Sequence, residues 1–317
     1  MATTAPTFLQ KPVDPARSNS GRSGPSALSR FARRTVFIIG GIVAVALIYT
    51  AVKAMGHATG GTWPFTSMPL PFSTDDVTMP PVMDIVLRFG QPQRTGDPKN
   101  LTMWILEAML FTFREAFVGF IIGIIIGMAI ALIMLRTRWL ERGVMPWVIV
   151  SQTVPLIALA PVVVAFGNQI KVPLFSWQQW MSVALIATYL TFFPVAVNGL
   201  RGLKSPTPLA LDFMRTNAAS GNATLWKLRM PAAVPYLIPA LKLAATASVV
   251  GAIVGEISAG VRGGLGRLLI DYSAQYLSDP SRLYCVVIGA ALLGVLFVAL
   301  INVTDLLLMR NRPREAR

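Results

Sequence analysis

The sequence predicts an all-α integral membrane protein with six transmembrane helices. Three observations lead to this fold class. First, 54% of the 317 residues are hydrophobic and only 13% are charged, whereas a soluble domain usually carries about 25% charged residues. Second, six apolar runs are each long enough to cross a bilayer core, which needs about 20 residues of helix. Third, basic residues gather in alternate segments between those runs.

The elements follow in order along the chain. Segment 1–34 is rich in Pro, Ser, Gly and Arg, so we expect a disordered basic tail. The first transmembrane helix is predicted at 35–56, and an extracytoplasmic segment at 57–106. A membrane domain of five helices occupies 107–308, and 309–317 is a second tail. The five helices are predicted at 107–135, 144–166, 180–200, 236–259 and 283–308.

The distribution of charge predicts the topology. Lys and Arg concentrate on the cytoplasmic loops of membrane proteins. With both termini in the cytoplasm, six spans place the four most basic segments on that side: 1–34, 136–142, 201–229 and 310–317. We therefore expect a multi-pass protein of the cytoplasmic (inner) membrane. The net charge of +14 is explained by orientation, so membrane lipid is an expected partner and nucleic acid is not.

Small residues and prolines inside the predicted helices indicate close packing and bends. The second helix carries Gly119, Gly123 and Gly127 at four-residue spacing. Glycines on one face let another backbone approach closely, so we expect a helix–helix seam rather than a pore lining. Proline inside a helix removes a backbone donor and kinks the helix. Kinks are expected at Pro155, Pro161 and Pro194.

The residue inventory argues against an enzyme. The chain has one His and one Cys, His57 and Cys285, so we expect no metal site and no cofactor. It has no phosphate-binding loop, so it cannot hydrolyse ATP itself. An intramembrane enzyme would need a nucleophile or metal motif, and neither Gly-x-Ser-x-Gly nor His-Glu-x-x-His occurs. An ion-driven secondary transporter would predict an internal repeat, and no convincing repeat is present.

The polar loop between the fourth and fifth helices is predicted to be structured. Thr207 suits a helix cap and Pro208 the first helical position. That helix should continue to about residue 220. Gly221 and Asn222 permit a sharp turn, and a second short helix should end at Pro231.

Large apolar side chains are expected to be exposed on this loop, namely Phe213, Met214 and Trp226. Exposed apolar groups on a short loop favour docking to a soluble partner. A pair of interfacial helices lying on lipid headgroups would carry a similar composition. Composition alone leaves both interpretations open.

The loop resembles the EAA motif of ABC importer permeases, which reads Glu-Ala-Ala, three residues, Gly, nine residues, an aliphatic residue, any residue, Leu-Pro. Anchored on Met230-Pro231, the triplet corresponds to Asp212-Phe213-Met214, the Gly to Ala218 and the aliphatic residue to Leu228. The match departs at the Glu, at Ala-Ala and at the Gly, and Gly221 offers an alternative turn. The resemblance implies coupling to an ATPase through Asp212, Phe213, Met214, Arg215, Ala218, Ala219, Ser220 and Gly221.

A resemblance to the nitrate/sulfonate/taurine branch of these permeases extends over about 80–305. It is carried by Pro80-Pro81-Val82-Met83-Asp84-Ile85, Thr112-Phe113-Arg114, Gln152-Thr153-Val154-Pro155, Phe192-Phe193-Pro194, Gly255-Glu256 and Gly264-Leu265-Gly266. The resemblance implies the type I importer permease fold, in which coupling helices sit in a groove of a cytoplasmic ATPase dimer. It also implies an extracytoplasmic substrate-binding protein, a second permease copy in a homodimer, and alternating access.

The segments 212–215, 226–237, 241–246 and 250–256 together look closest to permeases for vitamins or their precursors. On this resemblance the expected substrate is riboflavin, slightly ahead of a thiamine-pyrimidine precursor. Nitrate, sulfonate or taurine is the further alternative.

Two charged residues inside predicted spans are candidates for the translocation pathway. An ionisable residue within a span is a functional hypothesis by default. Glu256 lies near the outer end of the fifth helix and could face the pathway, or it could be a structural acid paired with Arg114 or Arg262. Arg114 could line the pathway too, or it could lie with Glu115 at the interface and extend outward.

Overall fold

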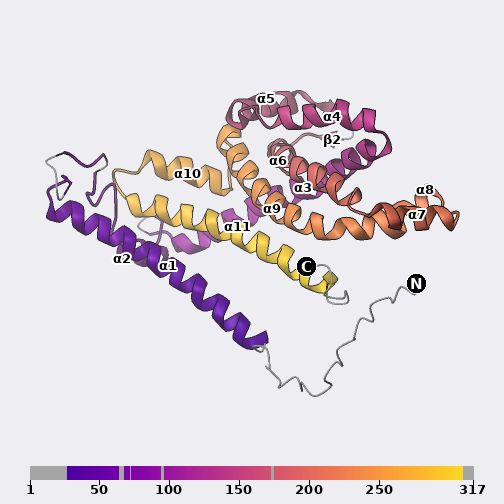
Figure 1. Cartoon of the computed structure of the whole chain (residues 1–317). Helices are drawn as coiled ribbons and strands as arrows, with labels where there is room; N and C mark the ends of the chain where they lie inside the picture. Colours follow the sequence, from indigo (N-terminus) through magenta and orange to yellow (C-terminus); the bar gives the residue numbers. More distant parts are fainter. Residues whose placement is uncertain (1–26, 64–67, 72, 94–95, 173–174, 310–317) are drawn as a thin grey trace, which may run out of the picture. The chain divides into compact units, whose positions relative to one another are not determined.

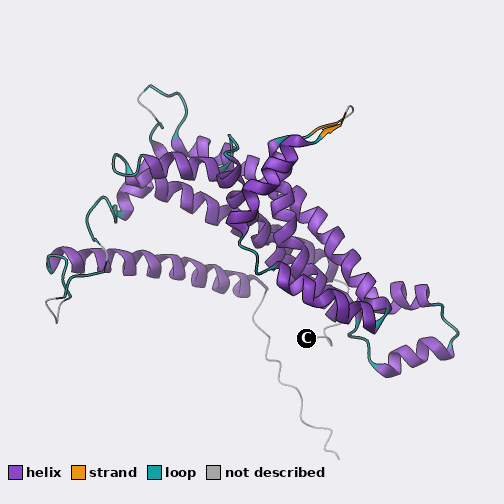
Figure 2. Cartoon of the chain, turned by 90° about the horizontal axis from the view of Figure 1, so that it is seen from above, coloured by secondary structure: helices purple, strands orange, loops and turns teal. Residues whose placement is uncertain are grey.

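The computed structural model describes residues 27–63, 68–71, 73–93, 96–172 and 175–309. These residues divide into two compact units, the first ending at Thr74 and the second beginning at Asp75. In the described part, five helices are long and apolar enough to cross a membrane, or six if one bent pair is a single span. The predicted all-α membrane fold is confirmed, with one hairpin of two short strands, each of two residues, as the addition (Figures 1 and 2).

The first unit contains α1 (Ala27–Ala58). The second contains α2 (Val82–Gly90), α3 (Leu101–Arg136), α4 (Arg138–Ser151), α5 (Leu156–Gln169), β1 (Lys171–Val172), β2 (Phe175–Ser176), α6 (Gln179–Leu203), α7 (Pro208–Thr216), α8 (Gly221–Thr224), the π-helical turn η1 (Leu225–Arg229), α9 (Met230–Ala259), α10 (Leu265–Ala274) and α11 (Pro280–Met309).

Two predicted boundaries differ from the structure. Helix α1 begins at Ala27, so 27–34 is helical rather than part of a disordered tail. That stretch holds good helix formers and no Gly or Pro, which favours continuation of the helix. Residues 1–26 and 310–317 of the predicted tails lie outside the described residues. Helix α3 begins at Leu101, inside the segment predicted as extracytoplasmic, because 101–106 continues the apolar run.

The glycine seam predicted for the second span is confirmed between α3 and α6. A Cβ on Gly119 would lie 2.5 Å from the Cβ of Ala187, and one on Gly123 would lie 2.5 Å from the Cβ of Thr191. A Cβ on Gly127 would lie 2.6 Å from the carbonyl oxygen of Phe192. Such contacts bring two backbones closer than any larger residue allows.

Gly123→Ala is therefore expected to lower the free energy of unfolding by about 1–3 kcal/mol, because overpacking forces α3 away from α6. The measurement is thermal unfolding of the detergent-solubilised protein. Gly294→Ala in α11 is the matched control, since a Cβ there meets nothing within 4 Å. Equal melting temperatures for the two variants would contradict the seam.

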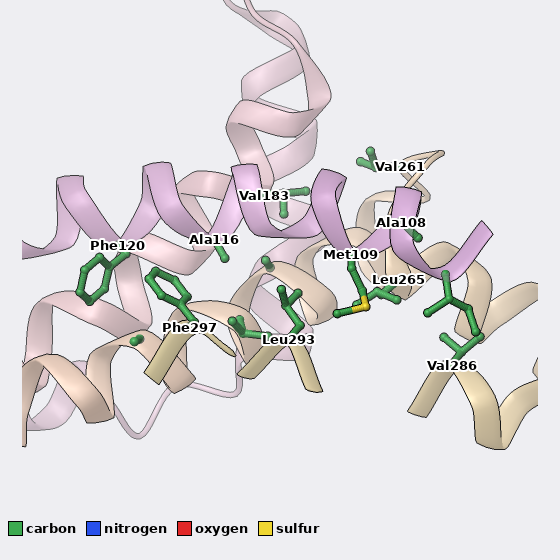
Figure 3. Close-up of a cluster of buried hydrophobic side chains, with 14 of the residues drawn as sticks. Ala108, Met109, Ala116, Phe120, Val183, Val261, Leu265, Val286, Leu293 and Phe297 are labelled. Carbon is green, nitrogen blue, oxygen red and sulfur yellow. The ribbon is translucent and has the colours of Figure 1, made fainter. Parts of the chain in front are cut away.

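Aromatic packing attaches α11 to α3. The ring of Phe297 meets Phe113 and Phe120 edge-on, with centroids 5.2 and 5.0 Å apart. Figure 3 shows Phe297 and Leu293 of α11 facing Phe120 and Ala116 of α3.

The single helix predicted at 144–166 is broken. Its residues belong to α4 and α5, which meet at an angle of 97°. Pro155 explains the break, because it lacks an N–H and disfavours helical geometry in the residue before it. The carbonyl of Ser151, at the end of α4, accepts a hydrogen bond from the hydroxyl of Tyr189 in α6. Discontinuous spans of this kind surround the substrate route in many transporters.

Candidate functional site

A protrusion formed by α7, α8 and the turns around them extends beyond the N-terminal end of α9, opposite the end that meets α10 (Figure 1). No residue of α7 is buried. Its most exposed large apolar side chains are Leu209 and Phe213, with 80% and 66% of their surface accessible. They lie four residues apart and therefore on one helix face. Trp226 of η1 is also exposed.

The first turn of α7 has the predicted cap. The hydroxyl oxygen of Thr207 accepts a hydrogen bond from the N–H of Ala210 at 3.3 Å, and Pro208 occupies the first turn. The helix ends at Thr216, earlier than the predicted residue 220. Its short length makes the protrusion compact.

The end of α7 forms a Schellman motif. The N–H of Ala219 bonds to the carbonyl of Met214 at 3.0 Å, and the N–H of Ala218 bonds to the carbonyl of Arg215 at 2.9 Å. The residue between such bonds adopts left-handed geometry and is usually Gly. Here it is Ala218, with φ of 49°, at the position where the resembling motif has Gly. The alternative that Gly221 supplies the turn is wrong, since Gly221 begins α8 with its N-cap at Ser220.

Ala218→Gly is expected to raise the melting temperature of the detergent-solubilised protein slightly. Left-handed geometry costs an L-residue about 1–2 kcal/mol, and Gly removes this cost. Gly also raises the entropy of the unfolded chain, which lowers the free energy of unfolding by about 0.4–1 kcal/mol, so the net gain is small. Ala219→Gly is the matched control, since Ala219 does not have a positive φ, and it should be destabilising. A lower melting temperature for Ala218→Gly than for Ala219→Gly would contradict this assignment.

The base of the protrusion is attached to the membrane bundle. The predicted stop at Pro231 is wrong, because α8, η1 and α9 run on without a break. The N–H of Met230 bonds to the carbonyl of Leu225, five residues earlier, and this wide turn precedes the proline. The guanidinium of Arg229 donates to the carbonyl of Leu203 at 3.0 Å. Motion of the protrusion would therefore be passed to both α6 and α9.

The eight residues predicted to couple to an ATPase all lie on this protrusion. They extend from the second half of α7 to the first residue of α8. Asp212 and Arg215 form an exposed ion pair at 3.0 Å, a kind that contributes little to stability. Met214 is half-buried, whereas Phe213 is exposed. Leu209 was not among the predicted residues, although its four-residue spacing from Phe213 is the signal that identifies it.

A second polar site lies at the other end of α9. The carboxylate of Glu256 accepts a hydrogen bond from the hydroxyl of Thr112 at 2.7 Å and from the N–H of Gly266 at 2.6 Å. The same Thr112 hydroxyl accepts from the N–H of Leu265 at 2.9 Å. Two of the free N–H groups at the start of α10 are thus satisfied by side chains of α3 and α9. We call Thr112, Glu256 and these two N–H groups the α10 cap.

Two glycines make room for this cap. A Cβ on Gly264 would lie 2.0 Å from an oxygen of Glu256, and one on Gly266 would lie 2.7 Å from its Cβ. The sequence Gly264-Leu265-Gly266 therefore has a structural explanation in the approach of the Glu256 carboxylate to the backbone. In the described part of the chain, neither Arg114 nor Arg262 forms an ion pair with Glu256.

Glu115 also belongs to this site, so the alternative that it lies at the interface with Arg114 is wrong. It is fully buried, and its carboxyl group lies against that of Glu256. A helical period would have placed it near Thr112, three residues earlier. Arg114 faces the surface instead, with its guanidinium 4.9 Å from the ring centroid of Trp180. The pathway roles predicted for Glu256 and Arg114 stay predictions.

With this geometry in place, comparisons with known proteins give a consistent result. Residues 119–314 match the family described as "Binding-protein-dependent transport system inner membrane component". The formylaminopyrimidine transport permease protein ThiX of Halalkalibacterium halodurans is 30% identical over 234 residues, which cover 71% of this chain and 89% of that protein.

Two further relatives are similar over shorter stretches or at lower identity. The riboflavin transport system permease protein RibX of Chloroflexus aurantiacus is 28% identical over 55% of this chain and 60% of its own length. The putative aliphatic sulfonates transport permease protein SsuC of Bacillus subtilis is 22% identical over 74% of this chain and 78% of its own length.

A solved structure shares the fold. The crystal structure of an amino acid ABC transporter with histidines superposes with a TM-score of 0.51, covering 64% of this chain and 94% of that one at 17% identity.

Proposed function

The chain belongs to the family of binding-protein-dependent transport system inner membrane components and is the permease subunit of an ABC importer, and from this premise we propose that it imports a pyrimidine vitamin precursor. In this proposal the protrusion faces the cytoplasm and binds a separate ATPase subunit. An extracytoplasmic binding protein delivers the substrate at the α10 end of the bundle. A second copy of the chain completes the translocation pathway.

The protrusion is the observation that carries the coupling role. It presents Leu209 and Phe213 on one exposed face while Arg229 ties its base to α6. An exposed apolar face on a short, anchored helix suits insertion into a groove of a soluble protein. Its basic neighbours, which include Arg215 and Lys227, favour the cytoplasmic side.

The proposed substrate class rests on the relatives. The formylaminopyrimidine permease aligns over most of its own length, whereas the riboflavin permease aligns over a smaller part. This favours a pyrimidine precursor over the riboflavin expected from the sequence, and riboflavin is the second candidate. Both are planar nitrogen heterocycles, whereas a sulfonate would need an anion site.

Uptake into proteoliposomes tests the proposal. They would contain the permease, the ATPase and the binding protein of the same transport system, with ATP enclosed on the ATPase side. We expect ATP-dependent uptake of labelled formylaminopyrimidine above that of riboflavin and of an alkanesulfonate. Preferential sulfonate uptake would reject the substrate class. Uptake that continues without ATP and follows an ion gradient would reject the ATP-driven mechanism.

A further inference from the structure

A groove on α4 lies apart from the protrusion and from the α10 cap. It runs along one face of α4 and is closed on one side by Lys204, the residue that follows α6. Its volume is about 680 Å³. The lining is basic at the start of α4 and apolar towards the bend with α5. Residues at helical spacing share one face of α4, and on this face the arginines come first and the apolar side chains follow.

The basic end holds an unneutralised pair of charges. Arg138 and Arg142 lie four residues apart on the face of α4 that lines the groove, and both are exposed. Lys204 is neutralised by its ion pair with Glu141. Across the described residues, neither Arg138 nor Arg142 forms an ion pair. The groove therefore offers two guanidinium groups to an anion, and Arg binds phosphate with a fixed two-pronged geometry.

The other end suits an alkyl chain. Met145, Ile149 and Val150 continue the same face of α4, and Ile149 and Val150 are each about half exposed. The distance along the helix from Arg142 to Val150 is about 12 Å. Trp139 and Trp147, with 80% and 75% of their surface accessible, mark α4 as a helix at the membrane surface, where Trp is enriched.

We propose that this groove is the binding site for an anionic phospholipid. The phosphate contacts Arg138 and Arg142, and the first part of an acyl chain lies along Met145, Ile149 and Val150. Basic pockets between membrane helices are suited to anionic headgroups. A soluble anion would use only the basic end, whereas a phospholipid would use the apolar end as well. The site does not depend on which substrate the importer carries.

Quenching of tryptophan fluorescence by brominated lipid tests the site in the detergent-purified importer complex. Bromines on an acyl chain quench nearby indole rings, and Trp139 is next to the groove residue Arg138 on α4. We expect brominated phosphatidylglycerol to quench at lower concentration than brominated phosphatidylcholine. Arg138→Gln combined with Arg142→Gln should weaken phosphatidylglycerol binding about tenfold or more. Trp139→Phe should remove the part of the quenching that differs between the two lipids, whereas Trp147→Phe, on the opposite face of α4, should leave that difference in place.

A matched control keeps the total charge loss the same. Arg136→Gln with Arg201→Gln removes two exposed arginines at the ends of α3 and α6, outside the groove. The lipid preference should persist in this variant. Because Arg138 and Arg142 are exposed, each single variant gives the same direction of change if the double variant is not recovered.

Three results would overturn the lipid site. The first is equal quenching by the two lipids in the unchanged complex. The second is relief of quenching by inorganic phosphate at constant ionic strength, which indicates a soluble anion. The third is loss of the ATPase from the Arg138→Gln, Arg142→Gln complex with lipid preference unchanged, which indicates a protein contact.

Discussion

Phe213→Asp is expected to weaken binding of the ATPase by about 30-fold or more and to reduce ATP-driven uptake accordingly. Phe213 is exposed on α7, so a carboxylate there should not unfold the permease. In the complex it would have to enter an apolar groove, where an unpaired charge is strongly disfavoured. Loss of a central aromatic contact typically costs at least 2 kcal/mol, which corresponds to about 30-fold weaker binding. Co-purification of the ATPase with tagged permease measures the effect.

Leu277→Asp is the matched control for this experiment. Leu277 is as exposed as Leu209, with 83% of its surface accessible, but it follows α10. It is therefore separated from the protrusion by α9, whose 30 residues span about 45 Å. The control should retain the ATPase. If Leu277→Asp loses the ATPase and Phe213→Asp retains it, the proposed orientation is reversed.

Glu256→Leu is expected to lower the free energy of unfolding by about 3 kcal/mol. Leu has a similar volume, but it cannot accept the hydrogen bonds from Thr112 and Gly266. Each buried donor left without an acceptor costs about 1–3 kcal/mol. Because the lost contacts attach the start of α10 to α3 and α9, that end of the bundle should loosen first. Thermal unfolding in detergent and hydrogen exchange of α10 measure the two effects.

Glu115→Leu is the matched control, because it removes a buried glutamate from the same site without removing an acceptor that the α10 cap uses. Its carboxyl group lies against that of Glu256, but it accepts none of the hydrogen bonds from Thr112 or from the start of α10. Replacing it with an apolar side chain removes the cost of burying a second polar group there. We expect a melting temperature equal to or above that of the unchanged protein. If Glu115→Leu lowers the free energy of unfolding as much as Glu256→Leu, the loss of stability does not come from the hydrogen bonds of the α10 cap.

Much of the fold was predictable because a membrane imposes simple requirements. A spanning helix needs a long apolar run, and α3, α6, α9 and α11 fall where such runs occur. The seam at Gly123 followed from spacing on a helix. The third span was mispredicted because hydropathy does not show where a helix bends. Both halves of the span are apolar, and the turn at Pro155 makes them meet at a large angle.

The protrusion was predictable in position but not in detail. Thr207 and Pro208 mark the start of α7 through local backbone chemistry, which sequence reports directly. The end depends on Ala218, a residue with no intrinsic preference for left-handed geometry. Only the hydrogen bonds from Ala218 and Ala219 back into α7 reveal that this alanine occupies the turn.

The sequence by itself determined the number and approximate limits of the apolar segments, the basic loops and the place of the protrusion, because each depends on residues close together in the chain. The tertiary structure decided which distant groups meet. Glu256 and Thr112, which are 144 positions apart in the sequence, come together at the start of α10, and Glu115 joins them in the core. A buried carboxyl group takes whatever donors the packed helices supply, so its partners follow from packing and not from its neighbours in sequence.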